Sequence, residues 1–224
     1  MTAPLRDLTG AGIDTAALLT LVQWLSPAFP VGAFAYSHGM ETAIAAGELS
    51  DGAAVAGWVA DVLDLGSGRA DAVQLAHALQ PGADHAALAD LARALATTSE
   101  RLRETEEIGA ALTRAINALA GTDHGPLPFP VALGRAAAPL GLPVALVIAV
   151  AVQAFAANLV NVAVRFVPLG QTEGQHILAR LRPLILRLAE DAAVTPLTGI
   201  ATTALRADIA SARHETLTTR IFRT

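Results

Sequence analysis

The chain has 224 residues, enough for one sizeable domain, and it contains no cysteine. The absence of thiols excludes disulfides, cysteine-bound zinc, iron–sulfur clusters and thiol catalysis. All 15 cationic residues are arginines, which removes Schiff-base lysines and the phosphate-loop lysine, and the net charge of −5 argues against a nucleic-acid partner.

The chain is poor in charge and rich in apolar residues. Hydrophobic residues make up 53% and charged residues 16% of the sequence, whereas an average domain has roughly 25% charged residues. A surface with so few charges exposes apolar area, which in soluble proteins usually marks interfaces. The alternative explanation for this composition is a genome that favours alanine and uses arginine in place of lysine.

The spacing of alanine and leucine predicts helices almost throughout. Asp14 is placed to cap the first helix, and Ser26–Pro27 ends it. The helices expected in the first half cover about residues 14–25, 38–46, 51–65, 70–79, 84–96 and 99–119. Those expected in the second half cover about residues 131–138, 143–164, a stretch from 172 onward and 198–215.

Three local signals refine these boundaries. Thr97 and Glu100 have the spacing of a capping box, which predicts a helix that restarts near Ser99. Thr172 and Gln175 predict a second capping box, and Pro183 is expected to kink or divide the helix that follows. The charged face of the 99–119 helix is interpreted as solvated, and it carries Arg101, Arg103, Glu104, Glu106, Glu107 and Arg114.

The helix at about 143–164 is long and apolar enough to span a membrane. Four polar residues fall within about 140° of one another on its surface, a stripe that lipid would penalise; they are Gln153, Asn158, Asn161 and Arg165. The segment is therefore expected to be the buried central helix of one all-α bundle of about eight to ten helices, with tails at 1–12 and 216–224. The first residues lack the apolar stretch of a signal peptide, so a cytoplasmic protein is expected.

Sites for chemistry are scarce. The six histidines show no metal-binding spacing, and only His38 and His214, each near a glutamate, are weak metal candidates. No nucleophile–base pair or nucleotide loop is present, so the chain is not expected to be an enzyme. The alternative is a small-molecule enzyme with a polar pocket on the 143–164 helix.

The connection between the first two helices concentrates scarce residues. It contains two phenylalanines, the only tyrosine, two prolines and two glycines. Such a segment either plugs the core or presents a recognition surface. Its notable residues are Pro27, Phe29, Pro30, Gly32, Phe34, Tyr36, Ser37, His38 and Gly39, with Glu41 just beyond.

The carboxyl end repeats this pattern. Guanidinium groups stand beside one large apolar side chain, the composition of an interface anchor. An untethered polar tail is the alternative. The residues concerned are Arg213, His214, Glu215, Arg220, Phe222 and Arg223.

Five motifs resemble the urease accessory protein F family. They are SPAFPVGAFAYSHGMET (26–42), RETEEIG (103–109), FPVALG (129–134), RFVPLGQTEGQ (165–175) and DIASARHETLTTRIFR (208–223). The fourth motif supplies residues expected to be structural, namely Arg165, Pro168, Gly170, Gln171 and Gln175.

The resemblance implies an all-helical component of nickel loading into urease that has no active site of its own and binds other accessory proteins. It implies a homodimer that binds accessory protein D, called H in some organisms, and recruits the GTPase accessory protein G on the way to apo-urease. No resident cofactor is implied, and nickel would only pass through the complex.

A mechanistic hypothesis follows from the two aromatic and arginine-rich segments. Tyr36, Ser37, His38 and Glu41 with Arg220 and Arg223 are expected to form or support the surface that faces the GTPase. Arg213, His214 and Glu215 are expected to brace the tail. A neighbouring hypothesis makes Arg220 an arginine finger for the GTPase.

Overall fold

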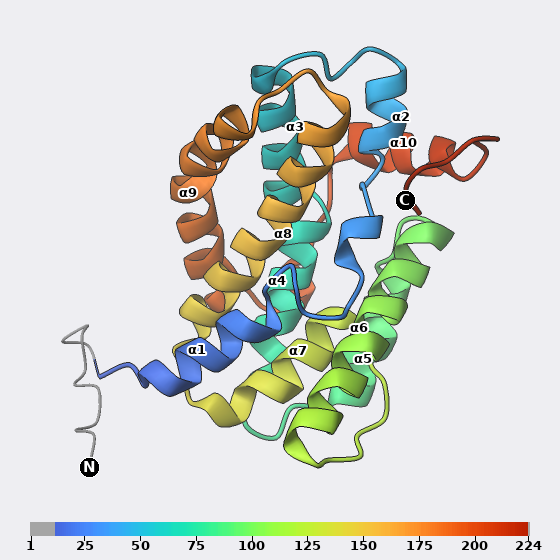
Figure 1. Cartoon of the computed structure of the whole chain (residues 1–224). Helices are drawn as coiled ribbons and strands as arrows, with labels where there is room; N and C mark the ends of the chain where they lie inside the picture. Colours follow the sequence, from blue (N-terminus) through green and yellow to red (C-terminus); the bar gives the residue numbers. More distant parts are fainter. Residues whose placement is uncertain (1–11, 224) are drawn as a thin grey trace.

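Helix-forming alanine and leucine yield an all-helical bundle. The computed structural model describes residues 12–223, and within them it contains no strand (Figure 1). The α-helices are α1 (Thr15–Trp24), α2 (Met40–Ala45), α3 (Gly52–Asp64), α4 (Ser67–Ala78), α5 (His85–Ala94), α6 (Ser99–Ala120), α7 (Phe129–Ala137), α8 (Val144–Phe166), α9 (Gln171–Val194) and α10 (Leu205–His214). Three short 3₁₀ helices, η1 (Ala33–Ala35), η2 (Ala138–Leu140) and η3 (Leu197–Gly199), lie between them.

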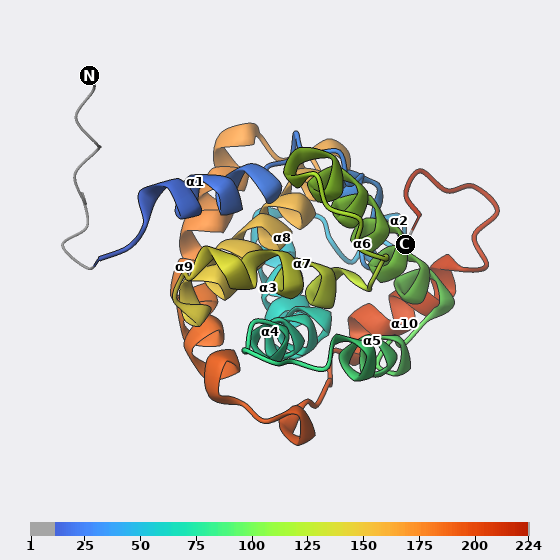
Figure 2. The same cartoon turned by 90° about the horizontal axis from the view of Figure 1, so that it is seen from below.

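Helix α8 runs through the middle of the bundle. It packs against α9, α4 and α3, and α1 and the first loop cross it on another side (Figures 1 and 2). Its inner face, including Val147, Ile148 and Leu159, is fully buried. The expected single all-α domain around a central helix is thus confirmed, although the outer face of α8 is only half-buried.

Among the described helices, α8 alone has the length and hydropathy of a membrane span. Within the bundle, 44% of its apolar window is buried. A polar stripe that is half-buried at Gln153, Asn158 and Asn161, together with the packing against three neighbouring helices, is typical of a core helix.

Several helix starts follow the sequence signals. The Asp14 carboxylate accepts the backbone N–H groups of Ala16 and Ala17, which caps α1. Helix α6 begins at Ser99 as predicted, but its cap is the hydroxyl of Thr98, which accepts the N–H of Arg101, so the predicted box of Thr97 with Glu100 does not form.

The second predicted capping box, at Thr172 and Gln175, does not form. Helix α9 begins at Gln171, and its N-cap Gly170 makes no side-chain cap. Pro183 does not divide the helix either, since α9 is continuous from Gln171 to Val194. The buried side chains of Leu181 and Ile185 on either side anchor the helix, which offsets the lost backbone hydrogen bond.

The last helix starts later than predicted. Residues 198–204 do not join α10, because the N–H groups of Thr203 and Ala204 donate to the Leu65 carbonyl and tie this stretch to the end of α3. The expected amino-terminal tail, 1–12, lies outside the described residues except for Gly12.

Candidate partner-binding site

Three glutamates of α6 form an acidic stripe. Glu100, Glu104 and Glu107 are spaced so that they share one face of the helix. Each reaches a different part of the two segments singled out in the sequence, the first loop (residues 26–39) and the tail (residues 216–223). The interpretation of this face as solvated is wrong for Glu104, which is buried, and for Arg101, which is largely so.

The centre of the stripe is a buried charge network. Glu104 Oε1 lies 2.8 Å from His38 Nε2 in the first loop. Arg101 Nη2 donates to Asp71 on α4 at 2.5 Å, and its Nη1 lies 3.4 Å from Glu104 Oε2. The loop is thereby held to both α6 and α4.

Burial and charge oppose each other in this network. Burial disfavours ionised Glu104, but the charges of His38 and Arg101 outweigh it and hold the pKa of Glu104 below its usual value. Burial also opposes charge on Arg101, yet Asp71 and Glu104 raise its pKa. For Asp71 burial prevails, and its pKa is raised.

Two consecutive residues of the first loop have a positive φ, which most residue types avoid. His38 has a φ of 52°, rare for a residue with a side chain, and Gly39 follows at 72°. A Cβ on Gly39 would lie 2.6 Å from the Ser211 backbone nitrogen, so only glycine lets the loop approach α10 this closely. The His38 ring also meets Phe155 edge to face at 4.7 Å.

One end of the stripe joins loop and tail directly. The Tyr36 hydroxyl donates to Glu107 Oε2 at 2.7 Å, and Arg223 Nη1 donates to the same oxygen at 2.6 Å. The backbone N–H of Arg223 also donates to the Ala35 carbonyl. Burial, together with the hydrogen bond to Glu107, raises the pKa of Tyr36 to about 12.

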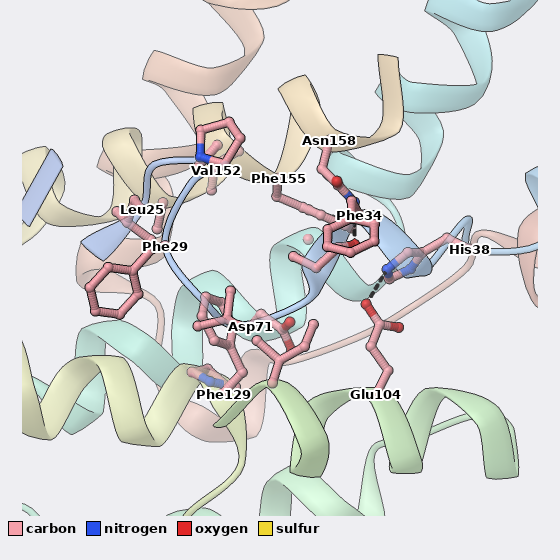
Figure 3. Close-up of a pocket in the computed structure, with 18 of the residues that line it drawn as sticks. Leu25, Phe29, Phe34, His38, Asp71, Glu104, Phe129, Val152, Phe155 and Asn158 are labelled. Carbon is pink, nitrogen blue, oxygen red and sulfur yellow. Dashed lines mark hydrogen bonds and ion pairs between the residues drawn. The ribbon is translucent and has the colours of Figure 1, made fainter. Parts of the chain in front are cut away.

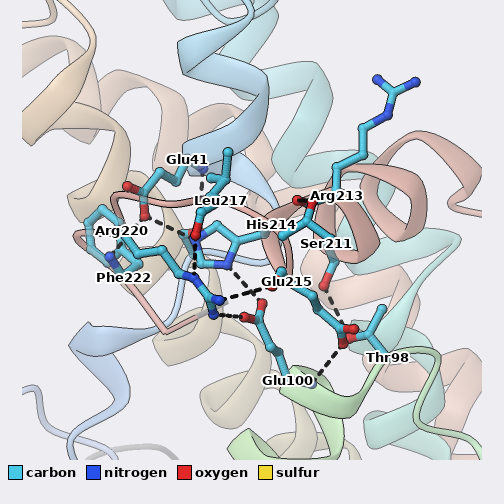
Figure 4. Close-up of polar contacts among 12 residues, drawn as sticks. Glu41, Thr98, Glu100, Ser211, Arg213, His214, Glu215, Leu217, Arg220 and Phe222 are labelled. Carbon is cyan, nitrogen blue, oxygen red and sulfur yellow. Dashed lines mark hydrogen bonds and ion pairs between the residues drawn. The ribbon is translucent and has the colours of Figure 1, made fainter.

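At the other end, fully buried His214 lies between two carboxylates (Figure 4). Its Nδ1 is 2.8 Å from Glu100 Oε2, and its Nε2 is 3.1 Å from Glu41 Oε2. Both ring nitrogens therefore face carboxylate oxygens, an arrangement that suits an imidazolium donating from each.

The same two carboxylates hold the tail. Glu41 accepts the backbone N–H groups of Ile221 and Phe222 at 2.9 and 2.8 Å. Glu100 Oε1 accepts Nη1 of Arg220 at 2.7 Å. Further along, the buried Phe222 ring meets Phe166 edge to face at 5.1 Å, so the tail is tethered rather than free.

Glu215 performs the capping that the sequence assigned to Glu100. Its Oε1 accepts the backbone N–H groups of Ser99 and Glu100 and the Ser99 hydroxyl, at the start of α6. The hydrogen bond from the Ser99 hydroxyl is the main reason that the pKa of Glu215 is lowered. Glu215, which is 115 residues from Glu100 in sequence, thus caps the helix, while the Glu100 side chain bonds to His214.

The structure sorts the predicted partner-binding residues by exposure. Side chains that are buried within this chain are Phe29, Tyr36, Ser37, His38, His214 and Phe222. Phe34 is 59% exposed, and Arg213, Arg220 and Arg223 face solvent. The rings of Phe29 and Tyr36 in the first loop therefore pack inward, and the ring of Phe34 faces outward.

The residues expected to be structural lie at turns and helix ends. Pro27 and Pro30 flank Phe29 in the first loop, and Gly32 has a φ of 73° before η1. Arg165 lies in the last turn of α8. Pro168 and Gly170 lie in the α8–α9 connection, and Gln171 and Gln175 lie at the start of α9.

The two metal candidates lie in different networks. His38 contacts Glu104 and Ser67, and His214 contacts Glu41 and Glu100. Within residues 12–223, no group of three histidine or acidic side chains is arranged to hold a metal ion.

A cavity of about 260 Å³ lies beneath the first loop, between α8 and the helices α4, α6 and α7 (Figure 3). Three of the four residues of the α8 polar stripe line it, namely Asn158, Asn161 and Arg165, but Gln153 does not. The amide of Asn158 donates to the Ala33 carbonyl at 2.8 Å, which attaches the loop to α8.

Comparison with known proteins agrees with the sequence motifs. The UreF family model matches residues 49–182. "Urease accessory protein UreF" of Cereibacter sphaeroides strain KD131 is 64% identical over 210 residues, which cover 94% of this chain and 100% of that protein. The protein of the same name from Roseobacter denitrificans is 48% identical over 216 residues, covering 95% of this chain and 96% of that protein. The chain therefore belongs to the UreF family of urease accessory proteins and has an accessory role in urease maturation.

Proposed function

We propose that this chain is a non-catalytic, cytoplasmic scaffold for nickel insertion into apo-urease. It joins accessory protein D/H and recruits or regulates the GTPase accessory protein G, acts as a homodimer, and uses neither nucleic acid nor membrane as a partner. Nickel passes through the complex without a resident site in this chain. The observation that carries the proposal is the joining of first loop and tail on the acidic stripe of α6.

The outer side of this joined region has the chemistry of a protein interface. Phe34 is 59% exposed and Ile221 is 65% exposed, although both are apolar. The side chains of Arg220 and Arg223 are 40% and 63% exposed beside them. Aromatic and arginine side chains dominate binding energy at interfaces, so these four residues are the proposed contact surface.

The buried residues support this surface from below. Tyr36, His38 and His214 are each bonded to a different glutamate of the stripe. Such contacts fix the backbone that carries Phe34 and the arginines, which lowers the entropy cost of binding a partner.

The contacts of Arg220 favour an anchoring role over an arginine finger. Its guanidinium donates to Glu100 and to the Glu215 carbonyl, and its Nε donates to the Leu217 carbonyl. A finger that reaches into a GTPase site would have to give up all three bonds.

The cavity beneath the loop gives the enzyme alternative little support. Four of its charged groups, Asp71, Arg101, Glu104 and His38, are paired with one another, and the Asn158 amide donates to the loop backbone. These groups therefore hold the fold, and a scaffold explains them without a substrate.

Retention of accessory proteins by tagged variants tests the proposal. Tyr36→Ala and Arg220→Ala are expected to abolish recruitment of the GTPase while the helical circular dichroism is unchanged. Arg182→Ala on α9 is the matched control, because Arg182 is exposed and has no ion pair within the described chain. Retention of the GTPase by both Tyr36→Ala and Arg220→Ala would refute the assignment of this region as the GTPase-binding surface.

A further inference from the structure

The cavity beneath the first loop has aromatic and aliphatic walls. Trp24, Phe29, Phe129, Val152 and Phe155 line it, from four separate parts of the chain (Figure 3). Its volume of about 260 Å³ exceeds the roughly 150 Å³ of an apolar cavity that accommodates benzene. It therefore has room for one aromatic side chain.

Two polar residues at the cavity have unused hydrogen-bonding capacity. Asn161 and Arg165 lie one turn apart on α8, and within the described chain neither side chain makes a hydrogen bond or an ion pair. The other ionisable groups of the cavity are paired with one another, so Arg165 is its one unpaired charged group among the described residues. An amide and a guanidinium side by side suit a carboxylate.

The cavity is also continuous with the proposed contact surface. Phe34 lines it and is 59% exposed, so a partner that covers Phe34 also covers the opening. Buried pockets that accept an aromatic side chain are where interfaces concentrate their binding energy. A free metabolite would need more polar contacts than the paired groups leave available.

We propose that this cavity is a socket for an aromatic side chain with a neighbouring carboxylate, carried by a protein of the accessory complex. The inference rests on the proposed scaffold function. The ring fills the space between Phe29, Phe129 and Phe155, and the carboxylate binds Arg165 and Asn161.

Two variants test the two halves of the socket. Ala154→Leu fills the cavity that Ala154 lines, and Arg165→Gln removes its unpaired charge. Their controls are Ala94→Leu on the exposed side of α5 and Arg182→Gln on α9. Each protein is first checked for unchanged melting temperature and oligomeric state, and its affinity for purified accessory proteins D/H and G is then measured by biolayer interferometry.

Both socket variants are expected to lose at least tenfold in affinity, and both controls are expected to bind like the wild type. If the wild type binds and the socket variants bind equally well, the socket is wrong while the scaffold function stands. If the wild type binds no accessory protein, the scaffold function itself fails and the socket with it.

Naphthalene-2-carboxylate serves as a probe of the cavity alone. Its binding is followed by quenching of Trp24, and Ala154→Leu is expected to abolish it. Arg165→Gln should weaken the probe but not its neutral methyl ester. The probe is also expected to compete with the accessory proteins. Saturable binding without competition would show that the cavity takes a free aromatic acid and would overturn the proposal.

Discussion

Single carboxylates, each shared between two or more groups, connect the first loop to the tail. Glu107 accepts bonds from Tyr36 and Arg223, and Glu41 accepts bonds from His214 and two tail amides. Because Glu107 bonds to both segments, its loss is expected to loosen both, whereas loss of Glu41 is expected to loosen the tail from α10. The consequences are measurable at individual residues.

Tyr36 offers a direct test, because it is the only tyrosine in the chain. Its absorbance at 295 nm is expected to titrate with a midpoint of about 12, against an ordinary value of 10.0. The raised pKa means that Tyr36 contributes stability below pH 10, which is lost as the pH rises from 10 toward 12. Glu107→Gln should lower the midpoint without restoring the ordinary value, since burial remains. A wild-type midpoint near 10 would contradict the buried, hydrogen-bonded geometry.

Glu104→Gln tests the charge network. The variant leaves His38 and Arg101 buried without their shared carboxylate, so the free energy of unfolding should fall by about 3 kcal/mol at pH 7. The pKa of Glu104 is lowered in the folded state. Its contribution to the free energy of unfolding is therefore present at neutral pH and is lost as the pH falls through the folded-state pKa. Urea unfolding should thus show the two proteins converging on acidification. A difference that is constant between pH 7 and pH 3 would exclude the ionised pair.

The sequence predicts which segments matter but not what holds them. Scarce aromatic residues and arginines in a loop and a chain end are conspicuous, and both segments do meet in the fold. The acidic stripe was missed because charges on a helix face are usually solvated. Glu104 and His38 are 66 residues apart, and Glu100 and His214 are 114 apart, so nothing local indicates the pairing.

Among the helices, two contacts are close because glycine has no side chain. A Cβ on Gly134 of α7 would collide with the Ala78 side chain of α4, and one on Gly109 of α6 would collide with the Leu127 carbonyl. These contacts set the distances of α7 from α4, and of α6 from the chain that leads into α7. They position the acidic stripe relative to the core.

Gly134→Ala is therefore expected to lower the free energy of unfolding by about 1–3 kcal/mol through overpacking. The matched control is Gly57→Ala on α3, where no atom beyond the neighbouring residues and backbone of the same helix lies within 4 Å of the added methyl group. This control should raise stability by up to about 1 kcal/mol, because alanine favours helix. Chemical denaturation measures both. A stabilising effect at both positions would contradict the close α4–α7 contact.

Helix positions were predictable where the signal is local. The caps at Asp14 and Asp51 form as their residue types suggest, and α6 is capped by Thr98, one residue after the predicted Thr97. The predicted capping box at residues 172–175 and the predicted division of α9 at Pro183 failed because packing across the bundle outweighs a local preference. The late start of α10 has a similar cause, namely the hydrogen bonds from residues 203 and 204 to α3.

Over the whole molecule, few charges and many apolar side chains leave exposed hydrophobic residues on several helices. Leu19, Leu119, Val194 and Leu205 are each more than 60% exposed. The composition alone predicted such a surface. Its distribution over separate helices fits a chain that several partners cover, as the scaffold function proposes.

We propose that docking of the tail on α6 creates the surface that binds the accessory proteins. The variant Glu41→Gln/Glu100→Gln removes the charges that hold the tail but leaves every exposed contact residue in place. Hydrogen exchange should show faster exchange at residues 216–223 with the helices still protected.

The deciding measurement compares this variant with the wild type. It is the affinity of each for the GTPase accessory protein G in the presence of D/H. We expect the variant to lose at least tenfold in affinity for the GTPase. Wild-type affinity in a variant whose tail has come loose would contradict it.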